Sequence, residues 1–132
     1  MNTRHVPSMM GVAAALFAAT MSVACVARSD DSLVIYAYDS FASEWGPAPI
    51  VIPAFEKAAG VKVELVVPGD AGQVLARAID EKSRPVADIL IGVDNNLLPK
   101  AIAAGVLQVY RPAAAEKVPA ELVLDPSWHV TP

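Results

Sequence analysis

The sequence predicts an α/β fold with a parallel or mixed sheet flanked by helices, and three observations support this prediction. Three short apolar segments rich in Val and Ile are typical of buried strands, at residues 33–37, 61–67 and 87–93. Amphipathic stretches typical of helices separate these segments. The resulting alternation of strand and helix is the pattern that builds a parallel sheet through right-handed crossover connections.

The first predicted strand, "LVIYA" at residues 33–37, does not alternate strictly between apolar and polar residues. This is expected of a strand that is covered on both faces. A helix is then predicted within "IPAFEKAAG", residues 52–60, and Gly60 is a good stop signal for it. Nearby prolines leave the start of this helix open, although Pro53 would fit its first turn.

The second predicted strand, "VKVELVV" at residues 61–67, leads into a helix over residues 70–83. Asp70 is well placed to cap the N-terminus of this helix. A helical repeat separates the apolar from the charged side chains, which predicts one buried and one exposed face. The apolar stripe contains Val74, Leu75, Ala78 and Ile79, whereas Arg77, Asp80 and Glu81 lie outside it.

The third predicted strand, "ADILIGV" at residues 87–93, precedes a helix in "NNLLPKAIAAG", residues 95–105, which is expected to stop at Gly105. From Leu107 onward the sequence is rich in proline and has little periodicity, so loop and extended chain are predicted there. Three strands alone provide a thin core, and we therefore expect marginal stability.

Polar residues follow each predicted strand, which suggests a binding site. In open α/β sheets, ligands bind outside the carboxyl ends of the strands. All three polar groups are therefore expected at one edge of the sheet. They are Tyr38, Asp39, Ser40 and Ser43 after the first strand, Gly69 and Asp70 after the second, and Asp94, Asn95 and Asn96 after the third.

The residues give little support for catalysis or for a metal site. The nucleophile pattern G-x-S-x-G is missing, and beyond the N-terminal segment the only histidine is His129. Glycine-rich phosphate loops are also missing, and "PGDAGQ" fits a tight turn with a helix cap better than an anion site. No carboxylates show calcium-loop spacing, which argues against a metal site. Together, these observations lead us to predict no catalytic residues, no metal and no cofactor.

An organic cation is the ligand that these residues suit best. An aromatic face attracts positive charge, and a nearby carboxylate adds a charge-assisted hydrogen bond. Tyr38, Trp45 and Asp70 are the candidates for such a site. Trp45 has the alternative of packing into the core, and the stretch with Asp94 and Asn95 has the alternative of capping a helix.

The N-terminus is predicted to direct export. Residues 1–24 contain Arg4 followed by a long uncharged, Ala-rich run, which is typical of a signal peptide. Cys25 is the only cysteine, so no internal disulfide can form, and it is a candidate for lipidation with residues 25–32 as a polar tether. The formal net charge is −4 and no basic cluster is present, which argues against nucleic acid as a partner.

Two longer stretches carry a resemblance to a known family. "YAYDSFASEWGPAP" at residues 36–49 and "ADILIGVDNNLL" at 87–98, with Gly69-Asp70 between them, resemble the thiamine-binding subunit of a bacterial ABC importer. The resemblance implies a periplasmic-binding-protein-like lobe, with residues 33–132 as the N-terminal part of a substrate-binding domain whose second lobe is absent from this chain. By motif, Tyr38 resembles a ring-stacking tyrosine and Asp70 resembles an acidic residue of the family's site. Asp94 and Asn95 lie in a family-typical stretch without an assigned contact.

The resemblance implies a transport function without catalysis. The protein would be periplasmic or at the cell surface, would capture thiamine or its phosphates, and would deliver the ligand to the permease subunits. Because the second lobe would be missing, the 132-residue chain is expected to bind thiamine weakly or not at all. Alternatives are a related binding protein for polyamine or ferric iron, an exported α/β enzyme with Asp39 or Asp94 as a base, and a lipoprotein that acts only as an interaction module.

Overall fold

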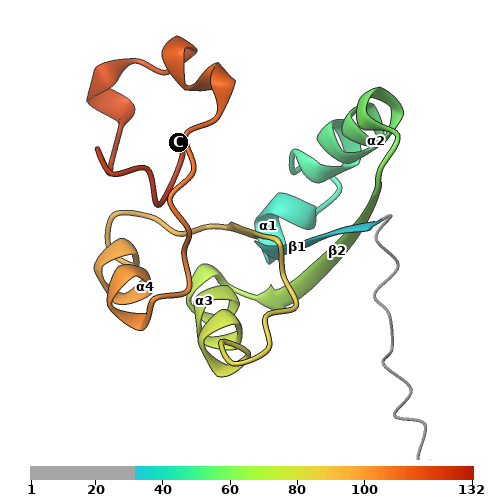
Figure 1. Ribbon diagram of the computed structural model, residues 1–132. Helices are drawn as coiled ribbons and strands as arrows, with labels where there is room; N and C mark the ends of the chain where they lie inside the picture. Colours follow the sequence, from blue (N-terminus) through green and yellow to red (C-terminus); the bar gives the residue numbers. More distant parts are fainter. Residues whose placement is uncertain (1–31) are drawn as a thin grey trace, which may run out of the picture.

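Three parallel strands form one sheet at the centre of the molecule (Figure 1). The computed structural model describes residues 32–132, so the predicted signal peptide, Cys25 and the predicted tether up to residue 31 lie outside the described residues. The strands are β1 (Ser32–Tyr38), β2 (Lys62–Gly69) and β3 (Ile89–Ile91), in the order β2-β1-β3. The predicted α/β class with a parallel sheet is therefore confirmed.

Strand β1 lies between the other two strands and is the most buried of the three. Val34 through Ala37 are buried, whereas β2 alternates between exposed and partly buried residues along much of its length. The register places Ile35 opposite Leu65 of β2 on one side and Ile89 of β3 on the other. The lack of alternation in "LVIYA" is thus explained by a central strand that is covered on both faces.

Strand β3 is shorter than predicted, since it covers residues 89–91 and not 87–93. Just before the strand, Asp88 forms two hydrogen bonds with Val34 of β1. The Asp88 backbone N–H donates to the Val34 carbonyl at 2.8 Å, and the Asp88 side-chain Oδ2 accepts from the Val34 N–H at 2.8 Å. A side chain thus replaces a backbone rung of the ladder. After the strand, Gly92 takes φ +119° and turns the chain away from the sheet.

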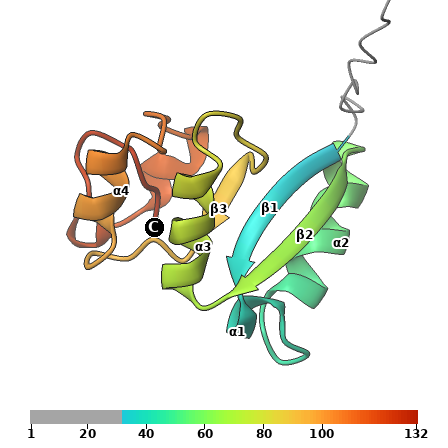
Figure 2. The same ribbon diagram turned by 90° about the horizontal axis from the view of Figure 1, so that it is seen from below.

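Within residues 32–132, four α-helices accompany the sheet, and the two longest lie on opposite faces of it (Figure 2). The crossovers from β1 to β2 and from β2 to β3 run in opposite directions, so right-handed connections place their helices on opposite sides. The helices are α1 (Asp39–Ala42), α2 (Ala48–Ala59), α3 (Ala71–Asp80) and α4 (Leu98–Ala104).

Helix α2 begins earlier than predicted, and Pro53 lies in its interior instead of its first turn. The helix starts at Ala48, and Pro49 occupies one of the first helical positions, where a missing N–H costs nothing. Pro53 removes the usual partner of the Pro49 carbonyl, but both residues are exposed and water can solvate that group. The predicted stop is confirmed, since Gly60 caps the helix with φ +71°.

Helix α3 supplies most of the core that covers the sheet. Val74 and Leu75 are fully buried, as the apolar stripe predicted, and Val74 packs with Val34 and Tyr36 in the central cluster. Asp70 caps the helix as predicted. Helix α4 starts three residues later than predicted because the chain between Asp94 and Leu97 forms a turn, and it ends at Gly105 as expected.

The C-terminal tail, residues 107–132, contains two short 3₁₀ helices where only loop and extended chain were predicted: η1 (Ala113–Lys117) and η2 (Ala120–Leu122). Asp125 is buried and accepts hydrogen bonds from the backbone N–H of Ser127 at 2.9 Å and of His129 at 2.7 Å. Among residues 32–132, no helix combines the length and the apolar character needed to cross a membrane.

Candidate functional site

A shallow cleft of about 440 Å³ lies at the carboxyl ends of all three strands. Parallel strands end at the same edge of a sheet, and the chain segments that leave them meet there. Members of all three predicted polar groups therefore meet at one edge, whereas Ser40, Ser43, Gly69, Asn95 and Asn96 do not line the cleft. The lining residues are Tyr38 and Asp39 after β1, Asp70 and Ala71 after β2, and Ile91, Gly92, Val93 and Asp94 at the end of β3.

Tyr38 is the aromatic residue of the strand-end cleft. It is the last residue of β1 and is half-buried. Its ring meets the ring of Phe41 edge-on, with centroids 6.2 Å apart and an interplanar angle of 61°. Phe41 is only partly buried, and it supports the Tyr38 ring through this contact.

Asp70 combines a structural role with a place in the cleft. Its Oδ1 accepts from the Gln73 backbone N–H at 2.8 Å, and Gln73 Oε1 accepts from the Asp70 N–H at 2.9 Å, so the two residues form a capping box. Asp70 Oδ2 accepts no hydrogen bond from the described residues. One carboxylate oxygen therefore holds the helix while the other is available to a ligand.

Asp94 lies in the cleft wall and holds the turn that leads into α4. Its Oδ1 accepts from the backbone N–H groups of Asn96 and Leu97, both at 2.9 Å, and its Oδ2 accepts from the Asn96 side chain at 3.2 Å. These bonds, the one from Leu97 foremost, hold the pKa of Asp94 below its usual value. The N-cap of α4 is Leu97, without a side-chain cap bond, so the alternative in which this stretch caps a helix is wrong for this structure, and Asp94 stabilises the preceding turn instead. Asn95 is exposed and does not line the cleft.

The charge of the cleft favours a cation. Asp39, Asp70 and Asp94 contribute three carboxylates, and no Lys or Arg is among the lining residues. Asp39 is exposed, and its Oδ1 accepts from the Ser40 backbone N–H at 2.7 Å. The carboxylates do not converge on one point, since the described residues contain no group of three or more His, Cys, Asp or Glu able to hold a metal ion.

Trp45 lies outside the cleft. It sits in the loop between α1 and α2, and 81% of its surface is exposed. The alternative in which Trp45 wedges into the core is therefore wrong for this structure. The loop is held by other means, because Gly46 packs so closely on the backbone of Ser40 and Phe41 that a side chain at position 46 would collide with it.

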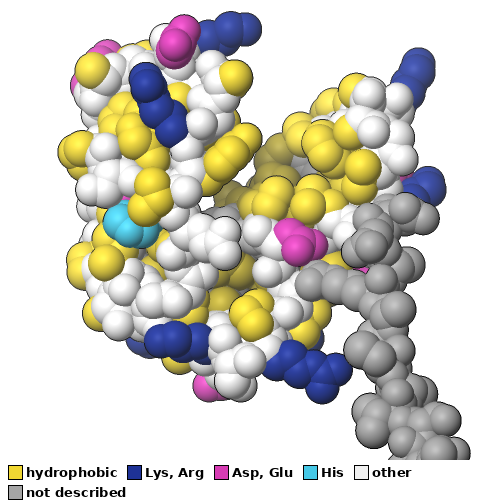
Figure 3. Space-filling model, in the orientation of Figure 1, with side chains coloured by type: hydrophobic (Ala, Val, Ile, Leu, Met, Phe, Trp, Pro, Cys, Tyr) yellow, Lys and Arg dark blue, Asp and Glu magenta, His cyan; other side chains and the backbone are white. Residues whose placement is uncertain are grey.

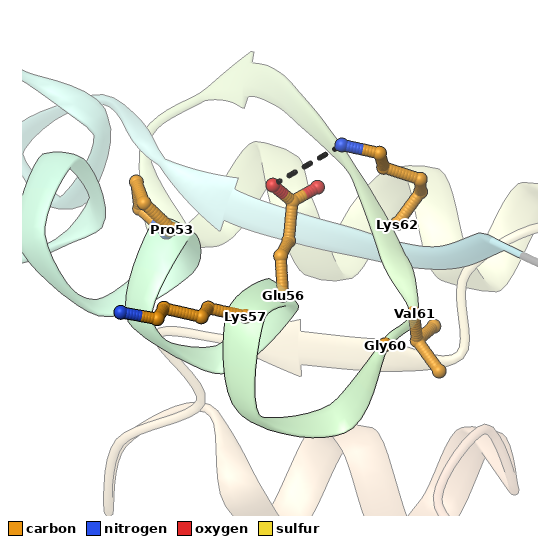
Figure 4. A pocket seen from close by; sticks show the side chains of 6 residues that line it. All are labelled: Pro53, Glu56, Lys57, Gly60, Val61 and Lys62. Carbon is orange, nitrogen blue, oxygen red and sulfur yellow. Dashed lines mark ion pairs between the residues drawn. The ribbon is translucent and has the colours of Figure 1, made fainter.

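A second hollow, of about 400 Å³, lies at the end of α2 (Figure 4). There Glu56 Oε1 accepts from the Val63 backbone N–H at 2.9 Å, and Glu56 Oε2 pairs with Lys62 Nζ at 3.7 Å. Glu56 therefore provides a hydrogen-bond acceptor for a backbone N–H near the amino end of β2. This hollow lies between the end of α2 and the start of β2, away from the carboxyl ends of the strands, and its charged groups are explained by packing.

Sequence reasoning missed two features of the cleft. Ile91 and Val93 line it although they lie in an apolar strand segment, because the strand ends early and leaves them at its rim. Gly92 also lines it, and its φ of +119° is a conformation that glycine adopts without strain. A glycine inside an apolar strand pattern was the signal that could have indicated this.

Comparisons with known proteins identify relatives of this chain. No protein-family model matches it. Thiamine-binding periplasmic proteins are similar in sequence: the protein of Brucella suis is 44% identical over 87 residues, 66% of this chain and 26% of the relative. The protein of Escherichia coli is 42% identical over 73 residues, 55% of this chain and 22% of the relative. The chain thus spans about a quarter of the length of these relatives.

Solved structures show the same relationship. A periplasmic thiamin binding protein matches with a TM-score of 0.59 and 40% identity over 67% of this chain and 28% of its own. A Trichodesmium protein (IdiA, FutA), solved in complex with iron and citrate ligands, matches with a TM-score of 0.62 and 26% identity over 74% of this chain and 29% of its own. The predicted binding-protein-like lobe and the predicted resemblance are confirmed: over about two thirds of its length, this chain is a relative of thiamine-binding periplasmic proteins.

Proposed function

We propose that this chain is part of an extracytoplasmic solute-binding protein that captures thiamine for an ABC importer. The observation that carries the proposal is the strand-end cleft, which combines one aromatic ring with three carboxylates and has no basic lining residue. Thiamine is a cation with two aromatic rings, so it suits such a lining. The names of the related proteins support the choice of thiamine among organic cations.

In this proposal Tyr38 stacks on a ring of the ligand and Asp70 Oδ2 faces its positive charge. Tyr38 makes a T-shaped contact with Phe41, which supports its ring beside the cleft. Asp70 is held by its capping box, so its side chain is already ordered before a ligand arrives. Asp94 would shape the neighbouring wall, whereas Asn95 and Trp45 would contact ligand only through a rearrangement of their loops.

Thiamine phosphates are proposed as further ligands, with a constraint on their orientation. A phosphate group would meet repulsion from Asp39, Asp70 and Asp94 if it pointed into the cleft. The phosphate must therefore extend away from this lobe. The same three charges would leave the affinity for the unphosphorylated vitamin intact.

The route to the site is also proposed. Residues 1–24 would be removed as a signal peptide, and Cys25 would then stand at the new N-terminus, in place to carry a lipid anchor. The periplasmic names of the relatives support a periplasmic or cell-surface location. The loaded protein would dock on permease subunits of the importer, and closure around the ligand would mark it as loaded.

Calorimetric titration of thiamine tests the proposal. Saturable one-to-one binding is expected for the longest product of this reading frame, and weak or no binding for the 132-residue chain, which spans 26% of a related protein. Tyr38→Ala should reduce the affinity. Tyr110→Ala is the matched control, because Tyr110 is 70% exposed and lies in the tail. Full binding by the Tyr38→Ala variant would contradict the proposal.

Ferric iron is the second candidate ligand, because a solved structure with iron and citrate has a similar fold. Iron would need several oxygen ligands, and Tyr36, Tyr38 and Asp39 lie within one short stretch of the chain. The phenol of Tyr36, however, is buried and bonded to Glu81. Addition of ferric citrate should give no visible absorption band if thiamine is the ligand, and a tyrosinate–iron band would favour iron. Spermidine, added as a competitor of thiamine, separates the polyamine alternative.

A further inference from the structure

Gly92 occupies the point where the segments that carry Tyr38 and Asp70 come closest to β3. A Cβ added to Gly92 would lie 2.8 Å from Tyr38 Cδ1 and 3.6 Å from Tyr38 Cε1. The same atom would lie 3.2 Å from the Cβ of Ala71, the first residue of α3 and the neighbour of Asp70. Position 92 therefore touches the aromatic side of the cleft and its acidic side at once.

The space at position 92 fixes the distance between these two sides. A contact of 2.8 Å between carbon atoms is well inside van der Waals contact, so any side chain would force the Tyr38 ring to move. The Tyr38 ring also contacts Phe41, with ring centroids 6.2 Å apart, so a shift of the ring would disturb this second contact. Retreat of α3 is also costly, since Val74 and Leu75 are fully buried against the sheet.

We propose that Gly92 is a positioning residue of the cleft: its missing side chain lets the Tyr38 ring lie against the end of β3 and sets the separation of that ring from the helix that Asp70 caps. The proposal deepens the proposed function, because it explains how the ring and the carboxylate are held at the spacing of one ligand. Its steric part does not depend on the identity of the ligand.

Position 92 also favours glycine because of its backbone conformation, and the cost of this conformation must be distinguished from the steric effect on Tyr38. At φ +119° any L-residue is strained, so Gly92→Ala would lose stability even without a neighbour. Gly60→Ala is a control for the general cost of alanine at positive φ, because Gly60 has φ +71° and an added Cβ meets nothing within 4 Å. A double-mutant cycle with Tyr38→Ala separates the two effects. The backbone strain of Gly92→Ala is present with or without the Tyr38 ring, whereas the steric clash requires that ring.

The experiment measures urea unfolding of the 132-residue chain and its variants. We expect Gly92→Ala to lower the unfolding midpoint, and we expect this loss to shrink to about half or less when Tyr38→Ala is also present. Gly60→Ala should cost the same in both backgrounds. If Gly92→Ala fails to fold alone but folds together with Tyr38→Ala, the proposal is supported in the same way. An equal loss, or an equal failure to fold, in both backgrounds would overturn it.

A spectroscopic readout follows the ring itself. The chain contains three tyrosines, so labelling with 3-fluorotyrosine gives three ¹⁹F signals, and Tyr38→Phe assigns one of them. In Gly92→Ala the Tyr38 signal should shift without any ligand present, whereas Gly60→Ala should leave it in place. An unmoved Tyr38 signal in folded Gly92→Ala would overturn the proposal. A shifted signal in a protein that does not bind thiamine would instead count against the proposed function alone.

Discussion

Helix α3 and the C-terminal tail, residues 107–132, are held in place by different forces. Helix α3 is anchored by apolar burial, because Val74 and Leu75 are fully buried between the helix and the sheet. In the tail the buried residues are Ala115 and Asp125, and the chain folds around the Asp125 carboxylate. Figure 1 shows the tail as a loop set apart from the sheet, and neither η1 nor η2 packs on another described element.

This difference explains why the residues that line the cleft have well-fixed positions. A binding site is most accurate when it is built on elements whose positions are fixed by packing. The strand-end cleft is formed by the ends of three strands and the N-terminus of α3, so it lies on the apolar-packed side. Figure 3 shows hydrophobic side chains gathered over α2, where Ile50 and Phe55 stay exposed, so this helix is less completely packed than α3.

The largest difference in stability between α3 and the tail is expected for a substitution at Leu75. Leu75→Ala should destabilise the protein by about 2–5 kcal/mol, because it leaves a cavity in a fully packed site. Leu122→Ala is the matched change in the tail, where the side chain is 54% exposed, and it should change stability by no more than about 0.5 kcal/mol. Urea unfolding measures both, and equal losses would mean that the tail contributes as much packing as α3.

A smaller effect is expected at Tyr36, whose hydroxyl joins β1 to the end of α3. The fully buried Tyr36 donates to Glu81 Oε2 at 2.8 Å, and Glu81 Oε1 also accepts from Arg77 Nε at 2.9 Å. Tyr36→Phe should cost about 1.5–3 kcal/mol, the typical net value of a hydrogen bond to a charged group. Tyr110→Phe in the tail, with 70% of the side chain exposed, should be neutral in the same unfolding measurement. A neutral Tyr36→Phe would show that apolar contact alone holds α3.

The smallest effect is expected for acid acting on the Asp125 carboxylate of the tail. Hydrogen bonding, above all from the His129 backbone N–H, lowers the pKa of Asp125. Because the folded pKa lies below the unfolded one, Asp125 stabilises the tail above its ordinary pKa, and this contribution is lost as pH falls through the lowered value. The amide NMR signals of Ser127 and His129 should titrate there, while that of Leu75 should not.

Asp125→Asn is the control for this prediction, since it removes the titrating group and keeps an acceptor oxygen. Its tail signals should not titrate in the acid range. If the Leu75 signal of the wild-type chain moved together with the tail signals, the two regions would form one cooperative unit and the comparison would be wrong.

Much of the fold was predictable because its signals are local. The apolar runs located all three strands, Gly60 and Gly105 ended two helices, and the Asp70 cap formed as predicted. The meeting of the polar groups at one edge followed from parallel strand order alone. Errors occurred where a distant residue decides the outcome, as at β3, where the Asp88 side chain replaces a rung of the ladder with β1.

The location of the site was predictable from the sequence, but the roles of its individual residues were not. Tyr38 and Asp70 were expected in the cleft and line it, whereas Trp45 was a candidate and lies outside it. Nothing in the sequence near Trp45 shows that Gly46, and not the indole, packs against α1. The role of Gly92 depends on two segments that are distant in sequence, so only the folded chain brings it to light.

The central claim is that the Asp70 charge recognises a thiamine cation in the strand-end cleft, and one substitution tests it most directly. Asn caps helices as well as Asp does, so Asp70→Asn in the longest product of the reading frame should keep the unfolding midpoint. Loss of a hydrogen bond to a charged group should reduce thiamine affinity by about tenfold or more in calorimetry. An unchanged affinity in the folded variant would contradict the account.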